Sequence, residues 1–205
     1  TQVLLVGDHN QLPPIGAGNA LRDILDHQLL PSHILVDCFR AAGQLKQNCN
    51  AILAGRARPT TPVLPTGGRE WRLIDTLDEP ADLIDALKLL MGGRLAQWGF
   101  DPIMECQIIT PYNAGPLGVN RINAELQRVW QQTVYGLTLP EVPADQEPRL
   151  RFHTGDKIIQ KKNDYKLDEA NGGVMNGTMG VITSIFEKRT SEGKKDIYLV
   201  QFEDR

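Results

Sequence analysis

The chain has 205 residues, a formal net charge of −3, 41% hydrophobic residues and 23% charged residues, as expected of a globular protein that can bury a core. It has neither the roughly 18 consecutive apolar residues of a membrane span nor a basic-then-apolar signal pattern, so we expect a cytoplasmic protein with no membrane partner. Its three cysteines and four histidines are scattered, so we expect no metal site formed by these residues.

The net charge does not predict nucleic-acid binding, because most nucleic-acid-binding domains have a clear basic excess. The charge is unevenly distributed, however. Residues 149–205 hold 11 Lys+Arg against 9 Asp+Glu, whereas the rest of the chain holds 11 against 16. Any contact with a polyanion is therefore expected mainly in the C-terminal part.

Strands and helices alternate in the predicted structure of residues 1–148. Apolar runs predict strands at 3–6, 34–36, 71–74 and 107–110, and apolar residues at helical spacing predict helices at 21–29, 45–53, 83–91 and 117–129. A loop rich in proline and glycine separates the two halves at 58–68. The alternation predicts an α/β fold in which helices cover a parallel sheet.

The pattern changes near residue 150. Three further strands are predicted at 157–160, 179–186 and 197–202, separated by Asn-Gly and Gly-Gly turns, which is typical of a small antiparallel β module. We therefore expect a domain boundary at this point.

The most specific motif follows the first predicted strand and reads Gly7-Asp8-His9-Asn10-Gln11-Leu12-Pro13-Pro14. It closely resembles motif III of superfamily 1 helicases. The resemblance implies that Gly7, Asp8 and Gln11 lie at the nucleotide, with Gln11 at the γ-phosphate, where it links the nucleotide state to the DNA-binding surface. A neutral amide suits this role because it can bind phosphate or water without the cost of burying a charge. The alternative interpretation is a tight turn that caps the next helix.

A second motif, Asp37-Cys38-Phe39-Arg40, resembles motif IV, in which an aromatic–arginine pair supplies a cation to the γ-phosphate. The planar fork of arginine stays charged and can stabilise the charge that develops during phosphoryl transfer. Arg40 is therefore, with Gln11, a candidate catalytic residue. Ala41 stands where family members usually have glutamine, which leaves the role of that position open.

The third motif spans residues 107–118 and includes Thr110-Pro111-Tyr112-Asn113. It is similar to the start of the second motor domain in RecD-like enzymes, where the Thr-Pro turn and the following helix lie along single-stranded DNA. The resemblance implies that Thr110, Tyr112 and Asn113 bind DNA, and hydroxyl groups and amides at a helix start are good phosphate ligands. For Tyr112, stacking on a base and packing against the helix are both open.

The fourth match lies in the predicted β module and includes Gly155-Asp156-Lys157 and Asn163-Asp164-Tyr165. It resembles the SH3-like β-barrel inserted in the second motor domain of RecD-type helicases, except that Thr178 replaces the usual aspartate. Lys161, Asn163 and Tyr165 would place a cation, an amide and an aromatic ring on one hairpin, together with Lys162. This mixture suits a sequence-independent grip on a single strand, although a solvated lysine face is the alternative.

In this order the four motifs resemble a RecD-like superfamily 1B DNA helicase, of the exodeoxyribonuclease V alpha-subunit type, from motif III into the SH3-like insertion. The resemblance implies the end of one RecA-like P-loop NTPase motor domain (1–57), part of a second (58–148) and an SH3-like β-barrel (149–205). It also implies an ATP hydrolase that uses ATP and Mg²⁺, translocates on single-stranded DNA from 5′ to 3′ and unwinds duplex. Nuclease or recombination subunits are expected as further partners.

The sequence contains no Gly-x-x-x-x-Gly-Lys-Ser/Thr loop, which would hold the β-phosphate and help to place magnesium. We therefore expect ATP and Mg²⁺ to be bound mainly by parts outside these 205 residues, and the isolated chain to be inactive. Two alternatives stay open. The chain could be a non-catalytic single-stranded-DNA-binding or docking module, as Ala41, Thr178 and the acidic main body suggest, or the helicase half of a conjugative relaxase.

Overall fold

A computed structural model describes residues 3–11, 16–35, 43–56, 71–143, 145–167, 172–190 and 193–202. The chain divides into two compact units, Thr1–Asp75 and Thr76–Arg205. The domain boundaries expected after residues 57 and 148 stay predictions. Within the described ranges, no helix is both long enough and apolar enough to cross a membrane.

The described residues of the first unit form two helices, α1 (Ala20–Asp26) and α2 (Gly43–Leu53), which confirms both helices predicted there. Asn19 occupies the N-cap position of α1 without a capping hydrogen bond from its side chain. The strands predicted at 3–6, 34–35 and 71–74 are wrong, since these segments have no regular secondary structure. A strand requires a neighbouring strand, and the described residues form only the sheet β1-β2-β3, which does not include these segments. Val36 and the loop predicted at 58–68 lie outside those residues.

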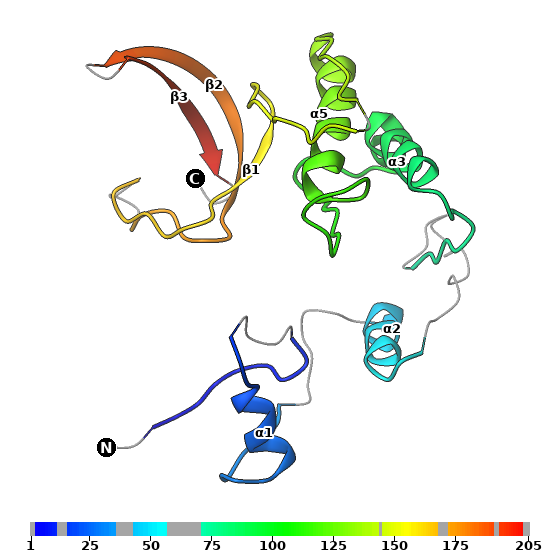
Figure 1. Ribbon diagram of the computed structural model, residues 1–205, viewed down its shortest axis with the longest axis vertical. Helices are drawn as coiled ribbons and strands as arrows, with labels where there is room; N and C mark the ends of the chain where they lie inside the picture. Colours follow the sequence, from blue (N-terminus) through cyan, green and yellow to red (C-terminus); the bar gives the residue numbers. More distant parts are fainter. Residues whose placement is uncertain are drawn as a thin grey trace. The chain divides into compact units, whose positions relative to one another are not determined.

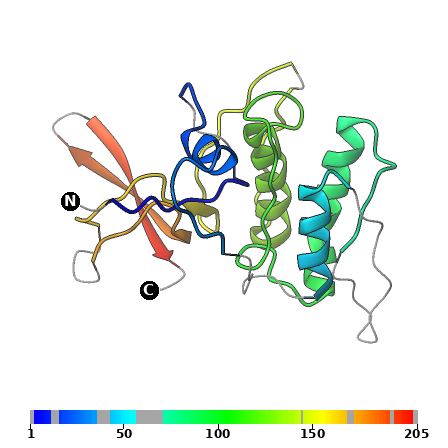
Figure 2. The ribbon, with the colours of Figure 1, turned by 90° about the horizontal axis from the view of Figure 1, so that it is seen from below.

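The helices of the second unit are α3 (Pro80–Leu89), η1 (Leu90–Arg94), α4 (Leu95–Gln97) and α5 (Val119–Tyr135). Proline at the first position of α3 is favourable, because it has no N–H to leave unpaired. Figures 1 and 2 show α3 beside α5. Buried Ile84, Ile122 and Leu126 form the core between them, with Leu87, Met91 and Leu117 packed against it. Both long helices were predicted, and α5 continues beyond its predicted end to Gly136, which caps it at a φ of 65°.

The strand predicted at 107–110 is also wrong, because these residues form no strand and Ile109 is 90% exposed. The described part of the second unit therefore contains no parallel sheet. The sheet formed by the described residues does not include this segment. A strand of a parallel sheet is covered on both faces, and the exposure of Ile109 shows that this segment is not.

The β module consists of β1 (Lys157–Ile159), β2 (Met179–Thr190) and β3 (Gly193–Phe202), in the sheet order β1-β2-β3. Both pairs are antiparallel, which confirms the three strands predicted in this region. Val174, Ile182 and Phe202 are buried and form the core of the module. In Figures 1 and 2, β2 and β3 run together as a long hairpin. Closure of this sheet into an SH3-like barrel stays a prediction.

Candidate nucleic-acid interface

Helix α5 supports the candidate interface of the second unit. The strap (residues 137–143 and 145–151) follows the helix, and its residues 141–143 and 146 contact Arg128 and then Arg121 as the chain returns toward the start of α5. Arg121 is only 9% exposed. Its guanidinium donates hydrogen bonds to the carbonyl oxygens of Val142 at 2.8 Å, Pro143 at 2.7 Å and Gln146 at 2.6 Å. One arginine thus fixes the strap to the first turn of α5 through the planar fork of its donors.

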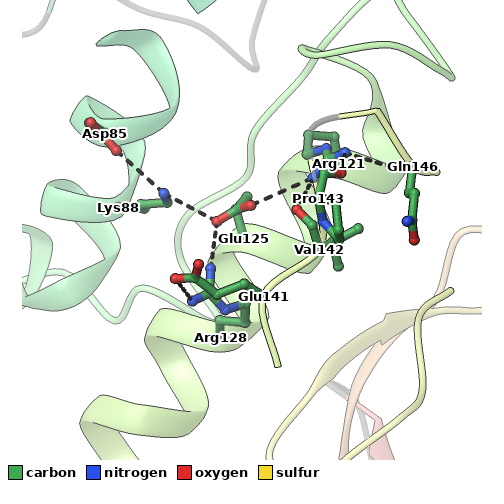
Figure 3. A network of polar contacts seen from close by, with 9 residues as sticks. All are labelled: Asp85, Lys88, Arg121, Glu125, Arg128, Glu141, Val142, Pro143 and Gln146. Carbon is green, nitrogen blue, oxygen red and sulfur yellow. Dashed lines mark hydrogen bonds and ion pairs between the residues drawn. The ribbon is translucent and has the colours of Figure 1, made fainter. Parts of the chain in front are cut away.

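Glu125 lies one turn further along α5, at the centre of a network of charges (Figure 3). Its carboxylate lies 3.1 Å from the Lys88 ammonium, 3.0 Å from the Arg128 guanidinium and 3.8 Å from the Arg121 guanidinium. Arg128 also pairs with Glu141 of the strap at 2.8 Å. The network therefore joins α3, α5 and the strap. Because Glu125 is 8% exposed, it depends on these cations to compensate for its lost hydration.

Among the described residues of the second unit, Lys88 and Cys106 have shifted pKa values. Burial lowers the pKa of Lys88, but the hydrogen bond and charge of Glu125, with those of Asp85, outweigh this effect, so the pKa lies above its ordinary value. Burial and the nearby charge of Glu105 raise the pKa of the Cys106 thiol. Lys88 therefore stays charged in its network, and Cys106 is not an activated thiolate.

The Thr-Pro loop (residues 110–118) brings Thr110, Tyr112 and Asn113 together at the start of α5. The Thr110 hydroxyl donates a hydrogen bond to the Leu117 carbonyl at 2.7 Å. The Val119 amide donates to the Tyr112 carbonyl at 3.0 Å, and the Asn120 amide to the Asn113 carbonyl at 3.5 Å. These helix-start amides therefore already have partners, contrary to their expected role as phosphate ligands. The Tyr112 ring is 60% exposed.

The close fit of this loop depends on a glycine. A Cβ atom on Gly118 would lie 2.5 Å from the backbone carbon of Ala114, so no other residue fits without moving the loop. The Gly115 amide also donates to the Glu147 carboxylate of the strap at 3.3 Å. The loop is thus held from both sides, by α5 and by the strap.

The tongue (residues 160–167 and 172–178) places Lys161, Asn163 and Tyr165 on one hairpin, as predicted. Asp164 and Val174 pair across it with two backbone hydrogen bonds of 2.8 Å. The Asn163 side chain acts as a brace, because its oxygen accepts from the Asn176 amide at 2.8 Å and its nitrogen lies 3.5 Å from the Tyr165 hydroxyl. Lys161 is exposed and Tyr165 is 64% exposed. A cation and a ring are therefore available to a ligand, while much of the Asn163 amide is already used.

The candidate nucleotide-binding residues lie in the first unit. The Asp8 carboxylate accepts hydrogen bonds from the Asn10 amide at 2.9 Å and from the Gln11 side-chain amide at 3.3 Å. A Cβ on Gly7 would lie 2.7 Å from a Leu21 methyl carbon of α1. Asp8 thus shapes a turn that orients Gln11. Residues 12–15, which follow Gln11, lie outside the described residues, and so does Arg40 of the second motif.

The sequence did not predict that four polar residues are buried and support the interface, namely Arg121, Glu125, Gln131 and Asp156. Two pairs on α5, Arg121 with Glu125 and Gln127 with Gln131, have the spacing of four that puts side chains on one helix face. This spacing was the available signal. Among the described residues, no cluster of His, Cys, Asp or Glu could hold a metal ion.

A family model described as an AAA domain matches residues 1–68, about a third of the chain. This match supports a RecA-like P-loop fold for that part of the chain.

The chain is also 31% identical to the ATP-dependent RecD2 DNA helicase of Deinococcus radiodurans over 88% of its length. It is 26% identical to the RecBCD enzyme subunit RecD of Mycolicibacterium smegmatis over 84% of its length. The chain spans 22% and 30% of these relatives. No solved structure matches it. The sequence is therefore RecD-like over most of its length, which confirms the resemblance predicted from its motifs.

Proposed function

We propose that this chain is part of an ATP-dependent DNA helicase of the RecD type, which uses ATP and Mg²⁺ to translocate from 5′ to 3′ on single-stranded DNA and to unwind duplex. The observation that carries the proposal is the extent of the relationship. Similarity to a protein named as a RecD2 helicase covers 88% of the chain, so it includes residues from both compact units. The sequence itself has no phosphate-binding loop, so hydrolysis is proposed for the larger protein.

At the nucleotide, Gln11 would act through its side-chain amide. Its present hydrogen bond to Asp8 is long, at 3.3 Å, and exposed, so water already competes for the same donor. A phosphate oxygen can compete for that donor, while the Asp8 turn keeps the residue at the same place. Arg40 would supply the cation that stabilises the transferred phosphoryl group.

At the DNA, the tongue would hold the strand without reading its sequence. Lys161 and Lys162 can neutralise phosphates, and the exposed Tyr165 ring offers a face on which any base can stack. The Thr-Pro loop would lie along the same strand and present Tyr112. Nuclease or recombination subunits are proposed as further partners, since one relative is named as a subunit of the RecBCD enzyme.

Two measurements test this function. In the larger protein with an intact phosphate-binding loop, Gln11→Ala and Arg40→Ala should each reduce DNA-stimulated ATP hydrolysis at least tenfold (about 1.4 kcal/mol in the barrier). Unchanged hydrolysis in both variants would remove these residues from the nucleotide site. For this chain, fluorescence anisotropy of a labelled oligo-dT should report binding that weakens as salt rises.

A second candidate is a non-catalytic module that binds single-stranded DNA or docks onto a partner. Ala41 and Thr178 depart from the helicase pattern, and residues 1–148 carry an acidic excess. The two candidates differ in one observation. Salt-sensitive DNA binding without any effect of Gln11→Ala on ATP hydrolysis in the larger protein supports the module.

A further inference from the structure

The tripeptide Gly155-Asp156-Lys157 begins the β module, and its central residue is a buried acid. Asp156 is 8% exposed. One carboxylate oxygen accepts from the Gln127 side-chain amide at 2.5 Å and from the His153 backbone amide at 2.7 Å. The other accepts from the Gln131 side-chain amide at 3.0 Å. Hydrogen bonds to an ionised carboxylate are stronger than those between neutral groups, so Asp156 attaches the module firmly to α5.

The neighbouring residues make contacts of the same kind. The Gly155 carbonyl accepts from the Trp130 indole nitrogen at 3.1 Å. A Cβ atom on Gly155 would overlap the Tyr135 ring, and its φ of +86° also favours glycine. The Lys157 ammonium donates to the Cys106 carbonyl at 3.2 Å, four residues before Thr110. The tripeptide thus contacts both α5 and the segment that leads into the Thr-Pro loop.

On its other side, the tripeptide is part of the module itself. The Gly155 amide donates to the Ile182 carbonyl at 2.7 Å, and the Ile182 amide donates to the Asp156 carbonyl at 3.0 Å. Ile182 lies in β2 and is 1% exposed. The β module that carries the tongue is therefore connected to α5 through these backbone hydrogen bonds and the Asp156 carboxylate.

We propose that Gly155-Asp156-Lys157 is a positioning element, which holds the tongue at a fixed offset from the Thr-Pro loop so that both contact one single strand of DNA. The proposal rests on the function proposed above. The α5 anchors, Gln127 and Gln131, lie about 12 to 20 Å along the helix from its start. Two weak contacts held at a fixed separation bind one long ligand much more tightly than either contact alone, and a loose connection loses this gain.

The test compares oligo-dT of about 5 nucleotides, which reaches one contact, with oligo-dT of about 16 nucleotides, which spans both. The unaltered 205-residue chain should bind the long oligonucleotide at least tenfold more tightly. Asp156→Ala should lose most of this preference and keep its affinity for the short one. Asp156→Asn, which retains one acceptor oxygen, should be intermediate. Lys157→Met removes the Cys106 contact and one positive charge, so it should weaken binding at both lengths and, in addition, reduce the preference for the long oligonucleotide.

Asp196→Ala is the matched control, since Asp196 is an exposed acid on β3 and its loss changes the charge of the module equally. Loss of one negative charge should by itself tighten binding to DNA slightly at both lengths, whereas loss of positioning weakens binding to the long oligonucleotide only. Hydrogen exchange of the Val174 amide, which is bonded across the tongue, reports whether the module stays folded. If Asp156→Ala loses this protection, Asp156→Asn and Lys157→Met decide the question.

The outcomes separate the two proposals. If the unaltered chain binds neither oligonucleotide at low salt, the proposed DNA-binding function fails and this inference fails with it. If the chain binds and prefers the long oligonucleotide, but the folded variants keep the same preference, the function stands and the positioning role is overturned.

Discussion

The Thr-Pro loop and the tongue are the two parts of the candidate interface, and they are built in opposite ways. In the loop, polar groups are turned inward, since the Thr110 hydroxyl donates to the Leu117 carbonyl and the Gly115 amide to the Glu147 carboxylate. In the tongue, backbone pairs hold the hairpin, and the side chains of Lys161 and Tyr165 are exposed. Hydrogen bonds therefore fix the shape of the loop, which exposes Tyr112, whereas the tongue exposes both a cation and a ring.

The largest expected effect comes from removing Glu125, the central carboxylate of the charge network that joins α3, α5 and the strap. Glu125→Ala leaves three cations around an empty position, so the free energy of unfolding should fall by about 3 kcal/mol. Urea denaturation measures this change. Asp145→Ala, at an exposed acid of the strap, should leave the stability unchanged. Equal stability of the Glu125 and Asp145 variants would show that the charge network does not stabilise the packing of α3, α5 and the strap.

The next effect concerns the tongue and should appear in binding instead of stability. Tyr165→Ala should weaken binding to oligo-dT about tenfold, since a base stacked on a ring contributes about 1 to 3 kcal/mol. Tyr165→Phe retains the ring and should bind normally. Anisotropy titration measures both, and urea denaturation should show little change for either. If Tyr165→Ala instead lowers the stability but not the affinity, the Tyr165 ring supports the fold of the tongue and does not contact DNA.

A smaller effect tests the inward orientation of the loop. Thr110→Val removes the hydrogen bond to the Leu117 carbonyl and should lower the free energy of unfolding by about 1 kcal/mol, whereas Thr110→Ser should not. The dependence of DNA affinity on salt should stay the same in both variants. If Thr110→Val instead keeps its stability but loses affinity, the hydroxyl contacts DNA, and the contrast between loop and tongue is wrong.

The smallest effect depends on pH. The pKa of Lys88 is raised in the folded chain, so its contribution to stability is complete below the ordinary lysine pKa and is lost as the pH rises through the higher folded-state value. The unaltered chain should therefore lose stability in strongly alkaline solution more steeply than Lys88→Met does. Lys162→Met, at an exposed lysine of the tongue, is the control. Identical slopes for all three would mean that the Lys88 ion pairs do not stabilise the fold.

The sequence predicted the helices and strands that are stabilised by contacts within a short stretch of the chain. Helix α5 has apolar residues at helical spacing, and β2 and β3 are adjacent strands that pair with each other, so both could be recognised within a short window. The strands predicted at 3–6 and 107–110 depend on partners far away in the chain. Their apolar runs predicted buried strands, but the sheet formed by the described residues includes neither segment.

The candidate site divides in the same way. Lys161, Asn163 and Tyr165 lie within five residues on one hairpin, so their proximity followed from the motif. The bracing role of Asn163 did not, because its partner Asn176 is on the other side of the tongue. Asp156 was noticed only as part of a motif, since its partners on α5 precede it by 25 and 29 residues. Contacts over such distances have no periodic signal.

The register of the β module brings together two segments that are far apart in the sequence. Ile158 of β1 and Phe202 of β3 pair with the same residue of β2, Gly180, from its two sides. Neighbouring strands lie about 4.8 Å apart, so Ile158 and Phe202 lie about 10 Å from each other, although many residues separate them along the chain. The three strands must therefore meet around one residue of β2 before the sheet is complete. Folding of this sheet depends on contacts between distant segments, which a short stretch of the chain cannot form alone.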